Sequence, residues 1–239
     1  MSAYQRILLK FSGEVLMGRQ DFGWDMQVIE QVADQVKAIR AQGVEVGLVI
    51  GGGNVFRGAQ VQSSKIARST ADQMGMLATL MNGVALRDVL QAHGVQARLM
   101  SAWSMEALAE TFNADLAKKA LAAGDVVIFA GGSGNPFFTT DTAAALRGIE
   151  IQADVVLKAT KVDGIYTRDP NKYSDAERLQ TLTYEQVIQQ DIAVMDLAAF
   201  ALCREHAMPI RVFDMLKPGA LERIVAGEDE GTLVSKGEV

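Results

Sequence analysis

Residues 6–11, RILLKF, and residues 45–50, EVGLVI, are two apolar runs separated by an amphipathic stretch at residues 25–42. In that stretch apolar residues such as Val32 and Val36 recur at helical spacing, so the whole segment predicts a strand, a helix and a strand. Neither apolar run alternates with polar residues, which is typical of strands that are covered on both faces. We therefore predict an α/β fold built on a mainly parallel sheet.

The same alternation continues through the rest of the chain, and no linker or internal repeat divides it. Further strands are predicted at residues 95–100, 125–130, 154–158, 210–213 and 232–234. Further helices are predicted at residues 69–93, 113–122, 140–152, 184–190, 197–205 and after Pro218. Helices that connect successive strands place a layer on each face of a parallel sheet.

The composition removes several classes of protein and of site. The chain has 239 residues, of which 49% are apolar and 22% charged, and a formal net charge of -6. This acidic balance argues against a protein that coats nucleic acid through its phosphates. The single cysteine, Cys203, and two distant histidines, His93 and His206, exclude an internal disulfide and the usual zinc or iron–sulfur ligand sets. No apolar run reaches about 18 residues, so we expect a cytoplasmic protein without a membrane span.

Two of the strand ends carry groups that suit a phosphate. Ligands of a parallel α/β sheet collect at the carboxyl ends of its strands. The first strand ends near Lys10, although a lysine beside a turn is as easily explained as a solvated side chain. The second strand ends in three glycines, residues 51–53, and Arg57 follows. Glycine lets backbone N–H groups approach an anion and arginine adds a fork of donors, so we predict phosphate binding here, without a Walker A or GxGxxG motif.

The loops after the fourth and fifth strands add further candidates. Residues 131–141, GGSGNPFFTTD, carry glycines, hydroxyls and an amide directly before a helix, whose N-terminus attracts anions. Helix capping explains the threonines but not the remaining residues, so a ligand platform is the preferred interpretation. After the fifth strand, Lys158 faces the same sheet edge as Lys10, and Tyr166 offers a ring for a purine.

Other unusual residues are interpreted as structural. Four apolar residues of the long helix are expected to fill the core: Met74, Met76, Leu77 and Met81. Asp72 would stabilise the first turn of that helix, with ribose binding as the sharper alternative. Cys203 and His206, on a late helix, are expected to have structural roles.

Longer motifs follow one another in a fixed order along nearly the whole chain. They are RILLKFSGE, VIGGGNVFRG, DQMGMLATLMN, SGNPFFTTD, VVLKATKVDGIYTRDP, VMDLAAFAL, KPGAL and GTLV. With these motifs the chain closely resembles the bacterial uridylate kinases of the amino acid kinase family. Several long motifs in one order are far more specific than any single glycine-rich loop.

The resemblance implies a fold, a reaction and partners. The fold would be one three-layer α/β/α sandwich over residues 1–239, assembled as a homohexamer. The reaction would transfer the γ-phosphoryl group of ATP to UMP, giving ADP and UDP, with Mg²⁺, as a step of pyrimidine nucleotide synthesis. GTP as an activator and UTP as an inhibitor belong to the same expectation. The acceptor is then a phosphate oxygen that is already anionic, so no histidine base is needed.

The resemblance also assigns residues to sites. For ATP it implies Lys10, Phe11, Ser12, Gly13, Gly53, Arg57, Thr160, Tyr166 and Asp169. For UMP it implies Gly52, Asp72, Ser133, Gly134, Asn135, Pro136, Phe137, Phe138, Thr139 and Thr140. Lys10, Lys158 and Asp141 would flank the transferred group, and Asp196 would orient a lysine. Asp141 is also the candidate ligand for Mg²⁺, and which carboxylate holds the ion stays open.

Some positions bear on regulation and depart from the pattern of the resemblance. The candidate regulatory residues are Gly18, Arg19, Gln20, Asp21, Phe22, Gly23, Asp88 and Arg98. Residues 113–125 carry fewer basic side chains than is typical, and Asp125 stands where a basic residue is common, which argues against GTP regulation. Ser133 replaces a common threonine and keeps its hydroxyl, whereas Arg168 stands where alanine is frequent.

Two rival functions stay open. An amino acid or carbamate kinase would share the fold, but the loop SGNPFFTTD together with Asp72 suits a nucleotide better than a small carboxylate. A non-catalytic protein that binds a nucleotide or an oxyanion would not need the charged groups that this chain retains: Lys10, Arg57, Asp141 and Lys158. We expect Lys10 to lie exposed at the sheet edge, where it would contribute little to the core.

Overall fold

A nine-stranded sheet forms the centre of the structure, a computed structural model that describes residues 2–57, 65–168, 170 and 172–237. The strand order is β4-β3-β5-β2-β1-β6-β10-β11-β9, and every neighbouring pair is parallel except β10 and β11. The strands are β1 Arg6–Phe11, β2 Glu45–Ile50, β3 Ala97–Ser101, β4 Glu110–Thr111, β5 Val126–Ala130, β6 Val155–Thr160, β9 Thr181–Thr183, β10 Ile210–Asp214 and β11 Thr232–Ser235. A separate two-stranded sheet pairs β7 Ile165–Tyr166 with β8 Arg178–Leu179.

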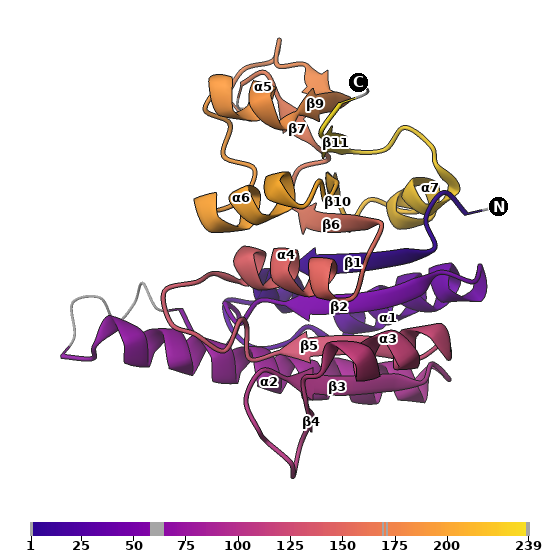
Figure 1. The fold of residues 1–239 in the computed structure, drawn as a ribbon, viewed down its shortest axis with the longest axis vertical. Helices are drawn as coiled ribbons and strands as arrows, with labels where there is room; N and C mark the ends of the chain where they lie inside the picture. Colours follow the sequence, from indigo (N-terminus) through magenta and orange to yellow (C-terminus); the bar gives the residue numbers. More distant parts are fainter. Residues whose placement is uncertain (1, 58–64, 169, 171, 238–239) are drawn as a thin grey trace.

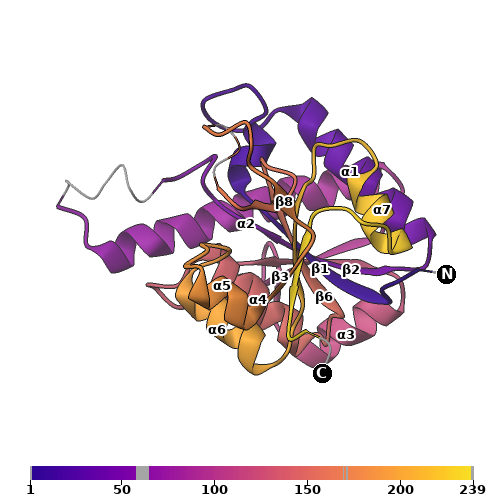
Figure 2. The ribbon, with the colours of Figure 1, turned by 90° about the horizontal axis from the view of Figure 1, so that it is seen from above.

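Helices cover both faces of this sheet, as predicted. They are the 3-10 helix η1 Gly13–Met17 and the α-helices α1 Met26–Ala41, α2 Arg68–Ala92, α3 Ala114–Ala122, α4 Thr140–Glu150, α5 Tyr184–Gln189, α6 Leu197–Glu205 and α7 Ala220–Ala226. One buried cluster joins α1, α2 and α7 to one face, and a second joins α3, α4, α5 and α6 to the other (Figures 1 and 2). The mainly parallel three-layer α/β/α arrangement is therefore confirmed.

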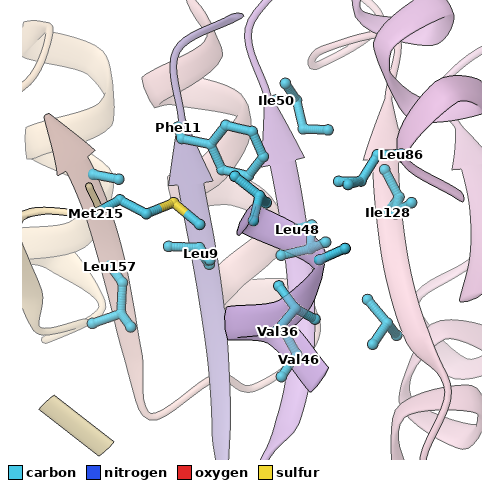
Figure 3. Close-up of a cluster of buried hydrophobic side chains, with 14 of the residues drawn as sticks. Leu9, Phe11, Val36, Val46, Leu48, Ile50, Leu86, Ile128, Leu157 and Met215 are labelled. Atoms are coloured by element: carbon cyan, nitrogen blue, oxygen red, sulfur yellow. The ribbon is translucent and has the colours of Figure 1, made fainter. Parts of the chain in front are cut away.

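The central strands are buried on both faces. In β1 and β2 every residue after the first is buried, which is the structural counterpart of their continuous apolar sequence. Leu9 and Leu48 point into the cluster beneath α1, where Val36 meets them (Figure 3), whereas Leu8 lies in the cluster on the opposite face. The successive apolar residues of β1 thus build both cores at once.

The strand order reverses at β1. The chain passes from β1 through α1 to β2 on one side, and β6 later pairs with β1 on the other side. A crevice at the carboxyl ends of the strands is expected at such a switch point, and it is the usual ligand position in open α/β sheets. Lys10 lies there, level with Val49 of β2 and with Lys158 of β6.

Helix α2 corrects one expectation about the core. Met76 is buried, but Met74, Leu77 and Met81 are 37%, 44% and 48% exposed. The N-terminal part of this 25-residue helix extends beyond the sheet (Figures 1 and 2), so its outer apolar stripe has no layer of this chain to cover it. Their spacing of three and four residues places the exposed side chains on one helix face.

The short elements were the least predictable from sequence. β4, β7, β8 and β9 have only two or three residues each, and β6 ends two residues later than expected, so Lys158 lies inside the strand. Cys203 is buried in α6, in keeping with a structural role. In the described part of the chain no helix combines the length and the apolar character needed to cross a membrane.

Candidate active site

The carboxylate of Asp141 lies between two lysines at the switch point. Its Oδ1 is 2.7 Å from Nζ of Lys10 and its Oδ2 is 2.7 Å from Nζ of Lys158. The lysines come from the adjacent strands β1 and β6, and Asp141 comes from the first turn of α4. The three side chains are only 11–17% exposed, so the expectation of an exposed Lys10 was wrong. Two cations share one anion, which leaves a net positive charge in a largely enclosed place.

The two lysines keep Asp141 ionised. Burial by itself would raise the pKa of this carboxyl, but the charges and close contacts of Lys10 and Lys158 lower it below its ordinary value, and Lys158 donates a hydrogen bond to Oδ2. Lys158 also donates from Nζ to the carbonyl oxygen of Val194 at 2.6 Å, which fixes its ammonium group from a second side. The carboxylate is therefore a permanent anchor for both ammonium groups at neutral pH.

Asp196 has a different role from the one expected. Its carboxylate accepts hydrogen bonds from the backbone N–H groups of Ala198 and Ala199, so it caps α6. It also accepts from the hydroxyls of Thr139 and Thr142, at the start of α4. Among the described residues no ion pair or hydrogen bond joins it to a lysine. Asp196 therefore ties the N-termini of α4 and α6 together, close in the chain to Val194, whose carbonyl oxygen accepts from Lys158.

The glycine loop presents free backbone donors beside the lysines. Within the described residues the N–H groups of Gly52 and Gly53 donate no hydrogen bond, as a phosphate cradle requires. The guanidinium of Arg57 folds back over the loop, with Nε donating to the carbonyl of Gly53 at 3.1 Å. Glu14, which sequence reasoning did not single out, lies 3.3 Å from Arg57 and 3.9 Å from Lys161.

The loops after β1 and β2 are packed tightly against each other. A Cβ on Gly13 would lie 2.4 Å from both the side-chain oxygen of Asn54 and the carbonyl oxygen of Gly51. A Cβ on Gly52 would lie 2.7 Å from the carbonyl oxygen of Gly75 in α2. These glycines are needed because backbone approaches backbone, which is a stronger reason than loop flexibility.

Two buried asparagines, Asn54 and Asn82, hold the glycine loop in place through hydrogen bonds. Asn82 of α2 donates to the carbonyl of Gly51 at 2.7 Å and exchanges hydrogen bonds with Asn54. Asn54 also donates to the carbonyl of Gly23, and Trp24 donates to Asn82. Sequence reasoning missed this network, although an asparagine in the apolar stretch MLATLMNG was a signal that could have revealed it.

A cavity of about 300 Å³ adjoins the glycine loop. It brings together residues of both predicted nucleotide sites: Gly52, Gly53, Arg57, Asp72, Phe138, Thr139 and Thr140. It also uses residues that were not predicted: Phe56, Ala71, Gly75, Met76, Thr79 and Gly132. Asp72 accepts hydrogen bonds from Arg68 and from the backbone N–H of Phe137, so it fastens the loop over this cavity instead of serving only the helix terminus.

Part of the predicted acceptor segment lies elsewhere. Ser133 and Asn135 line a separate cavity of about 410 Å³ between α4 and α6, and Phe138 lines both cavities. Phe137 is 67% exposed and has a φ of 73°, a conformation that favours glycine. The structure thus divides some of the predicted UMP residues between two cavities, whereas Gly134, Pro136 and Phe137 line neither of them.

Several of the predicted ATP residues have side chains that are buried or hydrogen-bonded within the protein. The side chain of Phe11 is buried in the core, and Ser12 caps η1 by accepting from the N–H of Glu14. The hydroxyl of Thr160 donates to the carbonyl of Val162, and that of Tyr166 donates to Asp163, which raises the pKa of Tyr166. Asp169 lies outside the described residues.

The candidate regulatory residues fall in two places. Residues 18–23 follow η1 and reach the glycine loop, because Gly23 donates to the carbonyl of Asn54. Asp88 is paired with Arg87 on α2, and Arg98 is paired with Glu110. Arg87 and Arg98 line a cavity of about 420 Å³ beside β3 and β4. No residue of the lysine cluster lines this cavity.

Asp141 does not fit the role of a direct magnesium ligand. Both of its oxygens contact lysine ammonium groups, which would repel a divalent cation. Across the residues that the structure describes, no three histidine, cysteine, aspartate or glutamate side chains are grouped as metal ligands. A magnesium ion here would have to be held largely by nucleotide phosphates.

Comparison with known proteins decides the family. The model of the amino acid kinase family matches residues 5–214. The chain belongs to the amino acid kinase family. Among curated relatives, the uridylate kinase of Hydrogenovibrio crunogenus is 62% identical over 97% of this chain and 98% of its own. That of Pseudomonas putida is 56% identical over 98% of this chain and 95% of its own.

Solved structures of family members agree with this fold. The crystal structure of UMP kinase from Bacillus anthracis superposes with a TM-score of 0.95, at 38% identity, over 98% of this chain and 97% of that chain. UMP kinase from Ureaplasma parvum gives a TM-score of 0.92 at 35% identity, over 97% and 99% of the two chains. The resemblance drawn from the motifs is therefore confirmed.

The lowered pKa of Asp141 predicts how stability depends on pH. A carboxyl whose pKa is lower in the folded state stabilises the fold above its unfolded pKa, about 3.9, and loses that contribution as pH falls through the folded value. Asp141→Asn, which leaves two buried ammonium groups without their anion, should cost about 3 kcal/mol at neutral pH. Urea unfolding of both proteins at pH values from 8 down to 2 measures this difference.

The difference in free energy of unfolding between the unaltered protein and Asp141→Asn should be constant between about pH 6 and 8. It should become smaller below about pH 4. The constant region is the internal control, because Asp141 is ionised throughout it. A gap that keeps the same size down to pH 2 would show that the lysines do not stabilise the ionised carboxylate.

Proposed function

We propose that this protein is a UMP kinase that transfers the γ-phosphoryl group of ATP to UMP, giving UDP and ADP. The observation that carries phosphoryl transfer is the pair of lysines around Asp141, at the same sheet edge as a glycine loop in which the N–H groups of Gly52 and Gly53 donate no hydrogen bond within the described residues. A cavity of about 300 Å³ adjoins that loop. The choice of UMP rests on the relatives, which are named uridylate kinase and match nearly the whole chain at 54–62% identity. A place in pyrimidine nucleotide synthesis follows from that reaction.

Phosphoryl transfer depends on stabilisation of negative charge and does not need a covalent bond between the protein and the transferred group. In the transition state, negative charge spreads over the oxygens of the transferred group. The ammonium groups of Lys10 and Lys158 lie on adjacent strands near the sheet edge where both nucleotides would meet. Each has three N–H donors, so it can donate to those oxygens while Asp141 stays beside it. Prearranged donors in a site with little water are worth more than the same donors in solution.

No general base is required. The attacking atom is a phosphate oxygen of UMP, which is ionised at neutral pH, so Asp141 has no proton to remove. Its pKa, lowered by the two lysines, makes it a poor base in any case. Asp141 is therefore a positioning residue for the lysines in this proposal.

Each nucleotide has a place. Gly53 and Arg57, which the resemblance assigns to ATP, line the same cavity as Gly52 and Asp72. We therefore place the UMP phosphate at Arg57 and the N–H groups of Gly52 and Gly53, with the nucleoside near Asp72. ATP would approach from the side of β6, where Thr160 and Tyr166 lie. Mg²⁺ is expected to arrive with the ATP phosphates and to neutralise their charge.

Assembly, regulation and location are further parts of the proposal. The exposed stripe Met74, Leu77 and Met81 supports association of copies of this chain, in line with the expected homohexamer. Activation by GTP, inhibition by UTP and a cytoplasmic location stay predictions. Arg98, a candidate for GTP, is already neutralised by Glu110.

The rivals are tested by the choice of acceptor. Purified protein with ATP and Mg²⁺ is offered UMP, CMP, AMP and N-acetylglutamate, and ADP release is measured. We expect UMP to be phosphorylated with the highest kcat/KM, at least tenfold above the others. A site that hydrogen-bonds the base of its substrate discriminates against analogues, because they leave polar groups of the site without a partner. Phosphorylation of N-acetylglutamate alone, or binding without turnover, would replace the proposal by one of its rivals.

The lysines are tested by charge removal at nearly constant volume. Lys10→Met and Lys158→Met should each lower kcat about 100- to 1000-fold, the usual cost of losing one preorganised donor to a transition-state oxygen. Lys118→Met is the matched control, because Lys118 is also ion-paired to an aspartate but lies on α3. The control should keep normal turnover, and near-normal turnover in Lys10→Met would show that the assignment of this lysine is wrong.

A further inference from the structure

The acceptor loop, residues 131–138, holds an unusual backbone conformation. Gly131, Gly132 and Gly134 have φ values of 78°, 60° and 83°, and Phe137 has 73°. Its internal side-chain hydrogen bonds, between Ser133 and Asn135, are exposed and 3.2–3.5 Å long. Such a loop needs contacts from outside to keep one conformation.

External hydrogen bonds hold the two ends of the loop. At the start, the N–H of Gly131 donates to the hydroxyl of Thr79 at 2.9 Å. At the end, the N–H of Phe137 donates to Asp72 at 2.9 Å. Both anchors line the 300 Å³ cavity.

The middle of the loop has a different anchor. The indole Nε1–H of Trp103 donates to the carbonyl oxygen of Gly134 at 3.0 Å. For residues 132–136, all of them described, it is the only hydrogen bond that comes from outside the loop. Gly134 in turn packs against this segment, since a Cβ there would meet Ala102 at 3.4 Å and the indole nitrogen at 3.8 Å.

Trp103 is itself rigidly placed. It follows β3, where its backbone N–H donates to the hydroxyl of Ser101, which is buried. The neighbouring Ala102 donates to the carbonyl of Ala130 at the end of β5. Hydrogen bonds thus fix the backbone of residues 102 and 103 to the ends of β3 and β5, and the indole joins this segment to the loop.

We propose that Trp103 is a positioning residue that preorganises the acceptor loop for UMP. The inference rests on the proposed function, because it takes residues 131–138 as the loop that closes over the acceptor nucleotide. Trp103 does not line the acceptor cavity, and within the described residues its hydrogen bonds go to Ser101 and Gly134 and not to the lysine cluster. Its contribution is therefore to the affinity for the acceptor and not to the transfer step.

Removal of the single donor tests this role. Trp103→Phe keeps an aromatic ring and loses the N–H, so we expect the KM for UMP to rise about three- to tenfold, the usual worth of one hydrogen bond. The KM for ATP and kcat should stay within about twofold. Tyr184→Phe is the matched control, because its hydroxyl also donates to a backbone carbonyl, that of Met208, inside a remote core.

A spectroscopic measurement covers the case in which Trp103→Phe does not fold. The chain has two tryptophans, so Trp24→Phe leaves Trp103 as the only indole emitter. Its emission should change saturably with UMP, with the dissociation constant that calorimetry gives for the same variant. The indole reports binding because its N–H is hydrogen-bonded to the loop that would contact UMP.

The outcomes separate this inference from the proposed function. An unchanged KM for UMP in Trp103→Phe, or a parallel loss in kcat and in both KM values, overturns the positioning role. Heat of UMP binding without any change in the emission of Trp103 also overturns it. If the unaltered protein does not phosphorylate UMP in the presence of ATP and Mg²⁺, the proposed function fails and takes this inference with it.

Discussion

The ion cluster in which Asp141 holds Lys10 and Lys158 is the interaction on which the active edge of this protein depends. Two ammonium groups on adjacent strands would repel each other and attract water if no anion lay between them. The carboxylate removes that repulsion at 2.7 Å from each lysine, and the lysines in turn lower its pKa. One positive charge is left over, which is what a transferred phosphoryl group can use.

Other features of the fold serve to place that carboxylate. The parallel register sets Lys10 beside Lys158, and Thr139 begins α4 so that Asp141 stands in its first turn. Asp196 fastens this helix start to α6 through two hydroxyls. A chain with a net charge of -6 thereby concentrates positive charge at one edge, so its total charge says little about which ligands it binds.

The sheet, the layers and the strand-end lysines could be predicted because they follow from apolar periodicity and from the rule that ligands collect at carboxyl ends. The contacts of Asp196 and the buried pair Asn54 and Asn82 could not, because they join side chains far apart in the chain. The exposure of Leu77 was also unpredictable, since periodicity shows that a helix face is apolar and not whether the chain covers it. Trp103 carried no motif, and only its distance to Gly134 reveals a role.

A crystal structure of the protein with UMP and a non-hydrolysable ATP analogue tests the central claim most directly. The account predicts that the terminal phosphoryl group of the analogue lies within hydrogen-bond distance of Nζ of Lys10 and of Lys158, with Asp141 still beside both. The UMP phosphate should lie on Arg57 and the glycine-loop N–H groups. Phosphates bound away from both lysines, with each ammonium group still occupied only by Asp141, would contradict it.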